Sequence, residues 1–367
     1  MRVTSVSHVA LSFMAAAALG LAAANAQSAP GGMLYTMNNA VSGNQVMAYT
    51  RAPNGVLTWA GSFATGGMGT GAGLGSEGSL TLSHDQNWIF AVNGGSNDVS
   101  VFSVAANGLT LTDTVATGGT TPVSVTSHRG LVYVVHSGSD NIAGFRLSPD
   151  GKLTPVPGSM QSLSGTGVGP AQISFDPDGD MLVVTEKNTN LITTFRIGGG
   201  GAAMPGQSMT SSGMTPYGFA FSPRNQLFIS EAFGGAANAS AVSSYRVDQS
   251  DALRLVAGSV KNDQSAACWT VTDGGGRFVY VSNTGSNTLS SYVVEFNGQL
   301  ALLQSQAAQT GAAPTDMATS SNGRFIYTLG GGDGSITGDK VLADGILVGF
   351  NAGVTGLPTS TVGLAGW

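Results

Sequence analysis

The chain has 367 residues, of which 55 are glycine and only 9 % are charged, and its formal net charge is −6. A surface that binds nucleic acid needs clustered Lys and Arg, and no run of the sequence is rich in either, so we expect no nucleic-acid partner. Glycine and β-branched residues are poor helix formers, so the composition favours many short strands joined by tight turns.

Residues 1–26 have the pattern of a secretory signal peptide. Arg2 precedes an apolar run over 9–24, and Ala24-Asn25-Ala26 supplies the small residues of a cleavage site, which makes Gln27 the mature N-terminus. The alternative is a membrane anchor, but the run is shorter than the roughly 20 apolar residues that span a bilayer. No later run reaches that length. We therefore expect an exported protein, secreted or periplasmic, without a membrane span.

A repeat runs along the rest of the chain. Its units open at Pro122, Pro170, Pro216 and Pro314, which are 48, 46 and 98 residues apart, and Ala267 takes the place of the missing proline. Within one unit, the pattern predicts a first strand from Pro170, a Pro-Asp-Gly turn ending at Gly179, a buried second strand over 181–186 and a third strand over 191–196. A glycine-rich loop and a weaker fourth strand follow.

Two series show that the unit occurs seven times. Buried second strands are predicted at 34–38, 88–93, 131–136, 181–186, 227–231, 278–283 and 325–329. An aromatic residue of the third strand recurs as Tyr49, Phe102, Phe145, Phe195, Tyr245, Tyr292 and Phe350. Seven units of four short strands indicate an all-β fold, a seven-bladed β-propeller that forms a single domain over 27–367.

The first unit lacks its opening strand, because residues 33–38 already form a second strand. We therefore predict that the C-terminal tail, 359–367, supplies the innermost strand of that blade and closes the ring. Closure would leave only short, protected sheet edges, which lowers the risk of edge-to-edge pairing.

Turn and strand signatures of several units resemble one known family. They are Phe175-Asp-Pro-Asp-Gly179, Gly276-Arg-Phe-Val-Tyr-Val-Ser-Asn283, Asn322-Gly-Arg-Phe-Ile-Tyr327 and Ser148-Pro-Asp-Gly-Lys-Leu153. From Met33 to about Gly356 the chain resembles the lactonase-type seven-bladed propellers, a family that includes 6-phosphogluconolactonase and carboxymuconate-cyclising enzymes. The resemblance implies a lactone hydrolase or a cycloisomerase-like enzyme acting on a sugar or related lactone. A fold alone does not give a function.

Candidate site residues follow from the alternation of strand direction. The start of each first strand and the end of each second strand meet at one mouth of the central channel. A His or a carboxylate with a tuned pKa can act there as general acid or base, so we take Glu231, His136 and Glu186 as catalytic candidates. The candidates for substrate binding are Gln172, Tyr217, Lys187, Trp269, Asn93 and Asn283. We expect the side chains of His136, Gln172, Glu186, Tyr217 and Glu231 to converge on a common cavity.

The chain departs from the family at the cationic positions. The resemblance implies His where this chain has Ser124, Gln172 and Gly218, and Arg where it has Tyr217 and Thr284, whereas the acidic position is kept as Glu231. A phosphate group gains its strongest hydrogen bonds from ionised partners such as Arg. We therefore expect weak activity on phosphorylated lactones, with Lys187 as the only nearby basic residue.

Several of these residues also have purely structural interpretations. Glu186 and Glu231 can satisfy backbone N–H groups of the next blade, and Trp269 can plug the channel. His84 and His128 are predicted on the opposite face as solvated turn residues. Cys268, the only cysteine, is predicted as a buried small hydrophobic residue.

No metal or cofactor motif is present in the sequence, so we expect neither. We expect a monomer that takes a small-molecule lactone or sugar acid. Two alternatives to lactone chemistry stay open. One is a non-catalytic propeller that serves as a binding or interaction scaffold, and the other is an envelope carbohydrate lyase.

Overall fold

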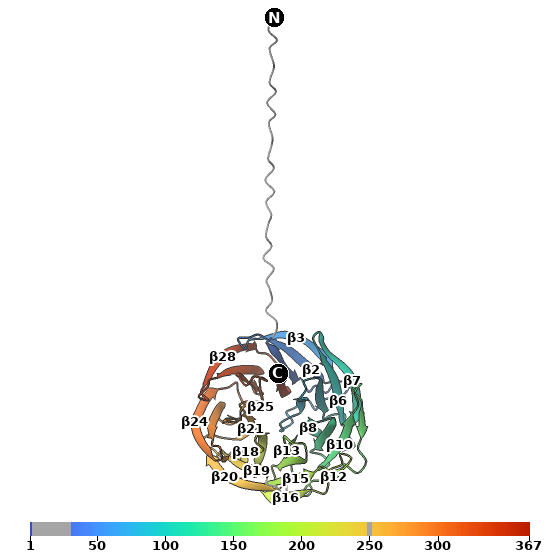
Figure 1. Cartoon of the computed structure of the whole chain (residues 1–367), viewed down its shortest axis with the longest axis vertical. Helices are drawn as coiled ribbons and strands as arrows, with labels where there is room; N and C mark the ends of the chain where they lie inside the picture. Colours follow the sequence, from blue (N-terminus) through green and yellow to red (C-terminus); the bar gives the residue numbers. More distant parts are fainter. Residues whose placement is uncertain (2–30, 248–251) are drawn as a thin grey trace.

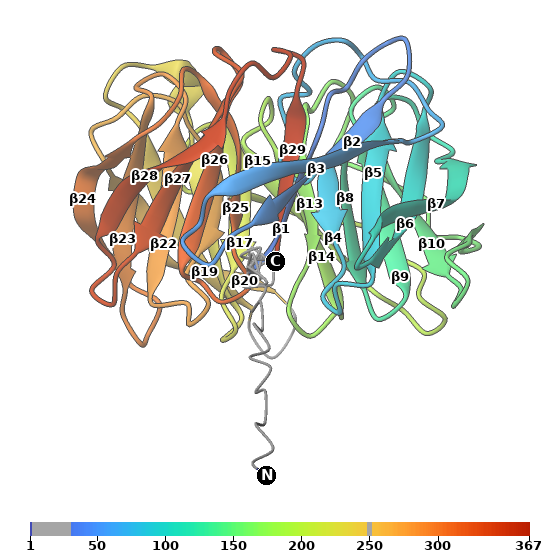
Figure 2. The ribbon, with the colours of Figure 1, turned by 90° about the horizontal axis from the view of Figure 1, so that it is seen from above.

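The computed structural model describes Met1 and residues 31–247 and 252–367, so the signal peptide predicted over 1–26 lies outside the described residues apart from Met1. The described residues form seven antiparallel sheets, which stand around a central channel like blades (Figures 1 and 2). The helical structure among them is one 3-10 turn, Phe233–Gly235. No helix in this part of the chain is long and apolar enough to cross a membrane. The predicted seven-bladed propeller is confirmed.

Each blade is described from its innermost first strand outwards. Blade one has β29 (Val362–Gly366), β1 (Gly32–Met37), β2 (Gln45–Arg51) and β3 (Leu57–Ala64), and blade two has β4 (Leu80–Leu82), β5 (Trp88–Asn93), β6 (Asp98–Ala105) and β7 (Gly108–Ala116). Blade three has β8 (Pro122–His128), β9 (Leu131–His136), β10 (Asn141–Leu147) and β11 (Leu153–Pro155), with β12 (Gln161–Ser162) also paired to β10, and blade four has β13 (Pro170–Phe175), β14 (Met181–Glu186), β15 (Leu191–Arg196) and β16 (Gln207–Thr210). Blade five has β17 (Pro216–Phe221), β18 (Gln226–Glu231), β19 (Ala241–Val247) and β20 (Leu253–Lys261), blade six has β21 (Ala267–Thr272), β22 (Phe278–Asn283), β23 (Thr288–Val294) and β24 (Leu300–Gln309), and blade seven has β25 (Pro314–Thr319), β26 (Phe325–Gly330), β27 (Ser335–Val341) and β28 (Leu347–Val354).

The prolines of the repeat stand at the first residue of β8, β13, β17 and β25, as predicted. Proline has no backbone N–H to give to a sheet, and the first position of a strand is one of the few that tolerate it. The spacing of these prolines therefore marks where each first strand begins.

The C-terminal tail closes the ring. Strand β29 pairs with β1 in antiparallel register, with Tyr35 opposite Ala365 and Leu34 opposite Gly366. The backbone N–H of Trp367 continues the ladder to the carbonyl oxygen of Met33 at 3.0 Å. The first and last strands of the propeller thus lie in one sheet, which confirms the predicted closure.

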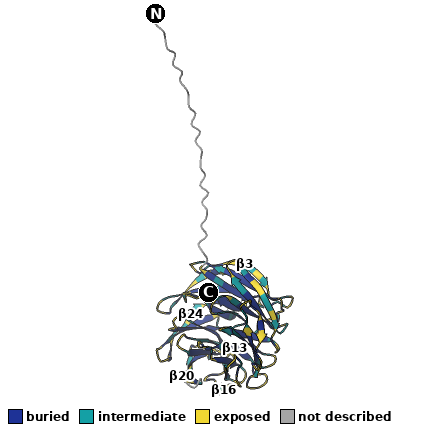
Figure 3. Ribbon diagram, turned by 45° about the vertical axis from the view of Figure 1, so that its right-hand side comes forward, coloured by how far each residue is buried: buried dark blue, intermediate teal, exposed yellow. Residues whose placement is uncertain are grey.

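The hydrophobic core lies between neighbouring blades. Second strands such as β14 and β18 are buried at every residue, whereas an outermost strand such as β3 is largely exposed. Figure 3 shows this gradient from buried inner strands to exposed outer edges. A strand covered on both faces needs a continuous apolar run, which explains why the second strands were the clearest signal in the sequence.

One aromatic of the third-strand series was misplaced. Phe350 lies in β28, the outermost strand of its blade, and not in the third strand β27. Its partner in β27 is Gly338, and a Cβ atom on that glycine would lie 2.5 Å from the Phe350 ring. The ring therefore fills the same space between blades from the neighbouring strand. The other six aromatics lie in third strands, as predicted.

Candidate functional site

The channel has two mouths, which differ in the strand ends that meet there. At the first, here called the loop mouth, first strands begin and second strands end, as in the pair of Pro170 and Glu186. At the second, here called the turn mouth, lie the hairpin turns between first and second strands, such as the turn from Asp176 to Gly179. The sequence-based candidates were all expected at the loop mouth.

Glu186, at the end of β14, is fully buried within its own blade. Its carboxylate accepts hydrogen bonds from the backbone N–H of Ser164 at 3.2 Å and from the hydroxyls of Ser164, Thr189 and Thr193, the last at 2.6 Å. Ser164 belongs to the loop that precedes β13, and Thr193 belongs to β15. The carboxylate therefore ties that loop to the third strand.

Glu231, at the end of β18, has the same kind of environment one blade further on. It accepts hydrogen bonds from the backbone N–H of Gly213 at 2.8 Å and from the hydroxyls of Ser243 and Ser259 at 2.5 and 2.7 Å. Burial raises the pKa of Glu231, and these three hydrogen bonds oppose the rise. Glu231 and Glu186 share no hydrogen-bond partner, so the structure places them in separate networks and does not bring them together.

The remaining candidates at second-strand ends are also engaged in hydrogen bonds, within their blades and, for the two asparagines, with the preceding blade. Asn93 and Asn283 donate to Ser100 and Ser290 of the adjacent third strands at 2.8 and 2.9 Å. His136 is buried, with Nδ1 3.2 Å from the carbonyl oxygen of Asn141 and with Nε2 lacking a partner, and burial lowers its pKa.

Gln172 points elsewhere and joins two blades. Its side-chain amide exchanges two hydrogen bonds with the backbone of Phe219, at 2.6 and 3.0 Å. The amide thereby links β13 to β17 across the channel wall.

Three of the predicted binding residues do come together at the loop mouth. The Lys187 ammonium lies 4.9 Å from the centre of the Tyr217 ring, and the rings of Tyr217 and Trp269 lie 5.3 Å apart. Burial lowers the pKa of Lys187 to about 8. The neighbouring Cys268 is buried, as predicted, and burial raises the pKa of its thiol to about 11. These four residues are called the Lys187 cluster below.

A segment that sequence reasoning missed covers this cluster. Residues 75–79, between β3 and β4, are called the channel segment. The Lys187 ammonium donates to the carbonyl oxygen of Gly75 at 2.5 Å, and Trp269 Nε1 donates to that of Ser76 at 3.2 Å. A Cβ atom on Gly75 would lie 3.4 Å from Tyr217 Oη and 3.6 Å from Lys187 Nζ, so both groups flank the same glycine.

The channel segment also carries a buried acid, Glu77, which faces a second one, Asp316 of β25. Burial raises the pKa of Glu77 well above its ordinary value, and the charge of Asp316 adds to the rise. Burial likewise raises the pKa of Asp316, against hydrogen bonds from three backbone N–H groups. One oxygen of Asp316 has no hydrogen-bond partner. In the sequence Glu77 is an acid between a glycine-rich run and a first strand, and no local pattern predicts that its side chain lies in the channel.

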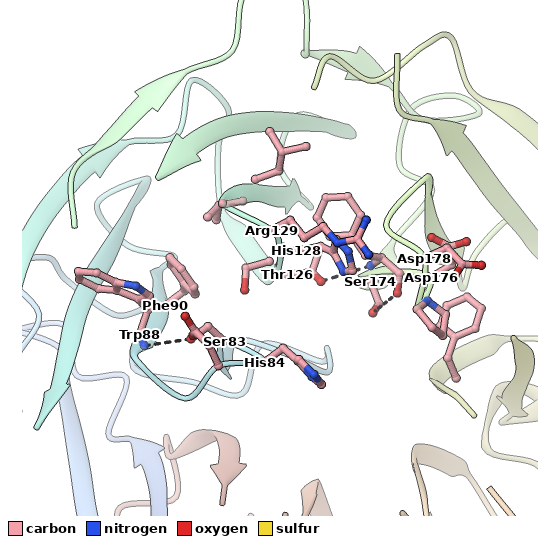
Figure 4. Close-up of a pocket in the computed structure, with 18 of the residues that line it drawn as sticks. Ser83, His84, Trp88, Phe90, Thr126, His128, Arg129, Ser174, Asp176 and Asp178 are labelled. Atoms are coloured by element: carbon pink, nitrogen blue, oxygen red, sulfur yellow. Dashed lines mark hydrogen bonds between the residues drawn. The ribbon is translucent and has the colours of Figure 1, made fainter. Parts of the chain in front are cut away.

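The large cavity lies at the opposite end, at the turn mouth. It has a volume of about 1130 Å³ and is lined by turns from six blades, including residues of blades two, three and four that Figure 4 shows. Its walls carry His84, Arg129 and Asp178 together with many hydroxyl groups. No group of three or more His, Cys, Asp or Glu side chains suited to a metal ion occurs among the described residues.

His128, predicted as a solvated turn residue, is instead packed into the wall of this cavity. Its ring lies 5.7 Å from that of Phe175, and a Cβ atom on Gly179 would lie 2.1 Å from it. Its Nε2 is buried without a partner, and burial lowers its pKa. The next blade therefore covers a ring that the turn by itself would leave in water. His84 is exposed, as predicted.

Comparisons with known proteins agree with this architecture. A family model described as "Lactonase, 7-bladed beta-propeller" matches residues 33–168, 156–270 and 255–338. No curated protein matches the chain. A candidate 6-phosphogluconolactonase from Bacteroides fragilis is 18 % identical, with a TM-score of 0.75 over 92 % of this chain and 98 % of that one.

Two further solved structures are similar. One is the periplasmic gluconolactonase of Pseudomonas aeruginosa, with 18 % identity and a TM-score of 0.72 over 91 % of this chain and 99 % of that one. The other is a protein from Lactobacillus plantarum, with 20 % identity and a TM-score of 0.75 over 92 % and 99 %. At these identities the similarity establishes the fold alone.

Proposed function

We propose, because this chain belongs to the lactonase family of seven-bladed β-propellers, that it hydrolyses a small neutral lactone at the loop mouth. The Lys187 cluster is the site of the reaction in this proposal. Lys187 polarises the lactone carbonyl, and Tyr217 and Trp269 form the apolar wall around the substrate ring.

The observation that carries the proposal is the hydrogen bond from Lys187 to a carbonyl oxygen. The ammonium of the half-buried Lys187 donates to the carbonyl oxygen of Gly75 and lies against the Tyr217 ring. A donor held in such a setting stabilises developing negative charge far better than one in water. In this proposal a substrate carbonyl oxygen binds at Lys187 in the position that the Gly75 carbonyl oxygen takes.

The chemistry that these groups support is a simple hydrolysis. Water adds to the lactone carbonyl carbon, and the carbonyl electron pair moves onto the oxygen that Lys187 and Tyr217 face. When this intermediate collapses, the bond from the carbonyl carbon to the ring oxygen breaks and the ring oxygen takes up a proton. The product is the open hydroxy acid, whose carboxyl proton passes to solvent.

The cluster favours a neutral substrate over a phosphorylated one. A phosphate dianion is bound tightly where several ionised donors surround it, and the Lys187 cluster contains a single cation. The charges of two acids, Glu77 and Asp316, also act on Tyr217 of this cluster. We therefore propose an uncharged sugar lactone or a related lactone as the substrate class.

The buried second-strand residues have a positioning role in this proposal. Glu231 holds Gly213 in the loop that leads into β17, the strand that carries Tyr217. Glu186 directly precedes Lys187 and fixes the end of β14. We propose that His136, Asn93 and Asn283 shape the loop mouth in the same way, without touching the substrate.

The experiment that tests the function is a lactone screen with a matched pair of lysine variants. Purified protein is assayed on a neutral gluconolactone, and Lys187→Met is compared with Lys340→Met, which changes an exposed lysine of β27. Loss of an oxyanion donor costs about a hundredfold in rate, so we expect that loss in Lys187→Met alone. Equal rates in both variants and the wild type would contradict the proposal.

A second candidate function is binding without chemistry, which the cavity at the turn mouth favours. Its volume suits a small-molecule ligand, and none of the residues of the Lys187 cluster lines it. Titration of the purified protein with small polar ligands tests this function. A ligand that Arg129→Ala weakens and Lys187→Met leaves unchanged would support it, and failure of every ligand to bind would count against it.

We also propose that the protein works outside the cytoplasm. The leader pattern of residues 1–26 supports export, and one structural neighbour is a periplasmic gluconolactonase. N-terminal sequencing of protein recovered from the periplasm or medium should begin at Gln27.

A further inference from the structure

The channel segment, residues 75–79, is bonded to the three blades whose first strands are β8, β13 and β21. Besides the contacts to Lys187 and Trp269, the hydroxyl of Ser76 donates to the carbonyl oxygen of Val123 at 2.8 Å, and the N–H of Glu77 donates to that of Ala171 at 2.9 Å. The carbonyl oxygen of Gly78 accepts the N–H of Val125 at 2.8 Å. The segment therefore lies against the inner strands β8, β13 and β21 and over the Lys187 cluster.

Glu77 fits into a space that one glycine provides. A Cβ atom on Gly218 would lie 1.9 Å from Glu77 Oε2, and the same oxygen lies 3.4 Å from the backbone nitrogen of Thr270. The side chain thus reaches the channel wall between β17 and β21, where no side chain of β17 competes with it.

The channel segment accepts a hydrogen bond from Lys187, the cation that the proposed reaction needs. While the segment is in place, the carbonyl oxygen of Gly75 lies at Lys187 Nζ, in the position proposed for a substrate carbonyl oxygen. Glycines stand on both sides of the inserted acid, at Gly75 and Gly78, each with positive φ. Glycine adopts such conformations without steric cost and gives the chain freedom to rearrange.

We propose that the channel segment is an internal inhibitor of the loop mouth, that Glu77 locks it in place, and that it opens when the Glu77 carboxyl ionises. This proposal rests on the proposed function, because the segment acts as an inhibitor only if the Lys187 cluster is the site of the reaction. The closed form corresponds to the structure described above. In the open form the segment leaves the channel, and Lys187, Trp269 and Cys268 become accessible.

The charged and titratable groups that face Glu77 support an opening driven by ionisation. They are Asp316 on β25, Tyr217 on β17 and Cys268 on β21, and Lys187 lies beyond Cys268. Of these only Lys187 is a cation. A carboxylate buried without a close cation is unstable, and release into water relieves this cost.

The pH dependence of opening follows from two groups, Glu77 and Lys187, whose titrations have opposite effects on the closed form. The pKa of Glu77 is raised in the closed form, so the closed form loses stability relative to the open one as pH rises above the ordinary carboxyl range. The pKa of Lys187 is lowered to about 8 in the closed form, so above that pH the closed form regains stability. Opening should therefore increase from acidic pH towards about 8 and not beyond.

The single cysteine of the chain provides a direct readout. Cys268 is buried beside the channel segment, so its labelling by a neutral maleimide reports opening, independently of any lactone. Labelling rates of the wild type and Glu77→Gln are compared between pH 5 and pH 8. The ratio of the two rates cancels the ordinary pH dependence of thiolate formation. Glu77→Gln keeps the shape of the side chain but cannot ionise.

We expect the ratio of wild type to Glu77→Gln to rise about tenfold over this range, which corresponds to one unit of differential pKa. Asp316→Asn removes a charge that helps to raise the pKa of Glu77, so the rise should be smaller and should be complete at lower pH. A ratio that stays constant within twofold, or a Glu77→Gln protein that labels as fast as the wild type at every pH, would overturn the inference. If the labelling ratio rises with pH as expected but no lactone is hydrolysed, the result supports opening of the segment and contradicts the proposed function.

Discussion

Glu77 Oε2 lies 1.9 Å from the point where a side chain on Gly218 would begin. The two residues are far apart in the sequence and belong to different blades, yet the absence of a side chain at one makes room for the carboxyl of the other. The family resemblance implies His at position 218. In this chain an acid from the channel segment fills that volume instead.

The first prediction concerns this close approach. Gly218→Ala places a methyl group against Glu77 and also 2.5 Å from the carbonyl oxygen of Cys268. Overpacking of this kind costs about 1–3 kcal/mol of unfolding free energy, measured by urea denaturation. The control is Gly199→Ala, where a Cβ atom meets nothing within 4 Å. Equal stability of the two variants would mean that Glu77 moves aside freely.

The second prediction concerns closure of the ring. Deletion of residues 359–367 removes β29, including the buried Val362 and Leu364, and leaves β1 as an open edge. Loss of these two side chains from the core costs about 3–6 kcal/mol, and an unpaired edge invites aggregation. Thermal unfolding followed by circular dichroism should lose its cooperativity. An unchanged melting temperature would show that β29 contributes nothing to closure.

The third prediction separates positioning from catalysis at Glu231. Glu231→Gln weakens charge-assisted hydrogen bonds from Gly213, Ser243 and Ser259, so we expect about 1–3 kcal/mol of destabilisation. The exposed Glu295→Gln serves as the control. At a temperature where all proteins are folded, kcat on a neutral lactone should change less than tenfold. A loss of a hundredfold or more in kcat, with KM unchanged, would instead make Glu231 a catalytic base.

The fourth prediction is a pH dependence set by Lys187. The protonated amine is the active form, and the pKa of Lys187 is lowered to about 8 by burial. Activity above the spontaneous rate should therefore fall as pH rises through that value. Lys187→Arg keeps its charge throughout this range, so its profile should lack the fall. A wild-type profile that is flat up to pH 10 would exclude a protonated Lys187 as the polarising group.

The fifth prediction concerns substrate charge. With a single cation in the Lys187 cluster, kcat/KM for a neutral sugar lactone should exceed that for its 6-phosphorylated form by about tenfold or more, since a charge-assisted hydrogen bond contributes about 1.5–3 kcal/mol. The two substrates are compared at the same ionic strength. A strong preference for the phosphorylated lactone would require a cationic cluster at another place, such as Arg129 at the turn mouth.

The sequence by itself determined the fold, because the signals that define a propeller are local. Prolines at strand starts, the Pro-Asp-Gly turn before Gly179 and continuous apolar second strands each act within about ten residues, and their repetition gave the number of blades. Even the closing strand followed, since the first unit visibly lacked its opening strand. Phe350 was misplaced because an aromatic from either of two adjacent strands fills the same space between blades.

Only the tertiary structure decided the site. The local pattern placed His136, Glu186 and Glu231 near the loop mouth, but whether a side chain faces the channel or its own blade depends on hydroxyls such as Thr193 and Ser259 that the register brings to it. Glu77 reaches the channel through contacts with Ala171, Thr270 and Gly218, all roughly 100 residues or more away in the sequence. Burial that depends on several separate blades leaves no periodic pattern along the chain, and it is this burial that perturbs the pKa values of Glu77 and Lys187.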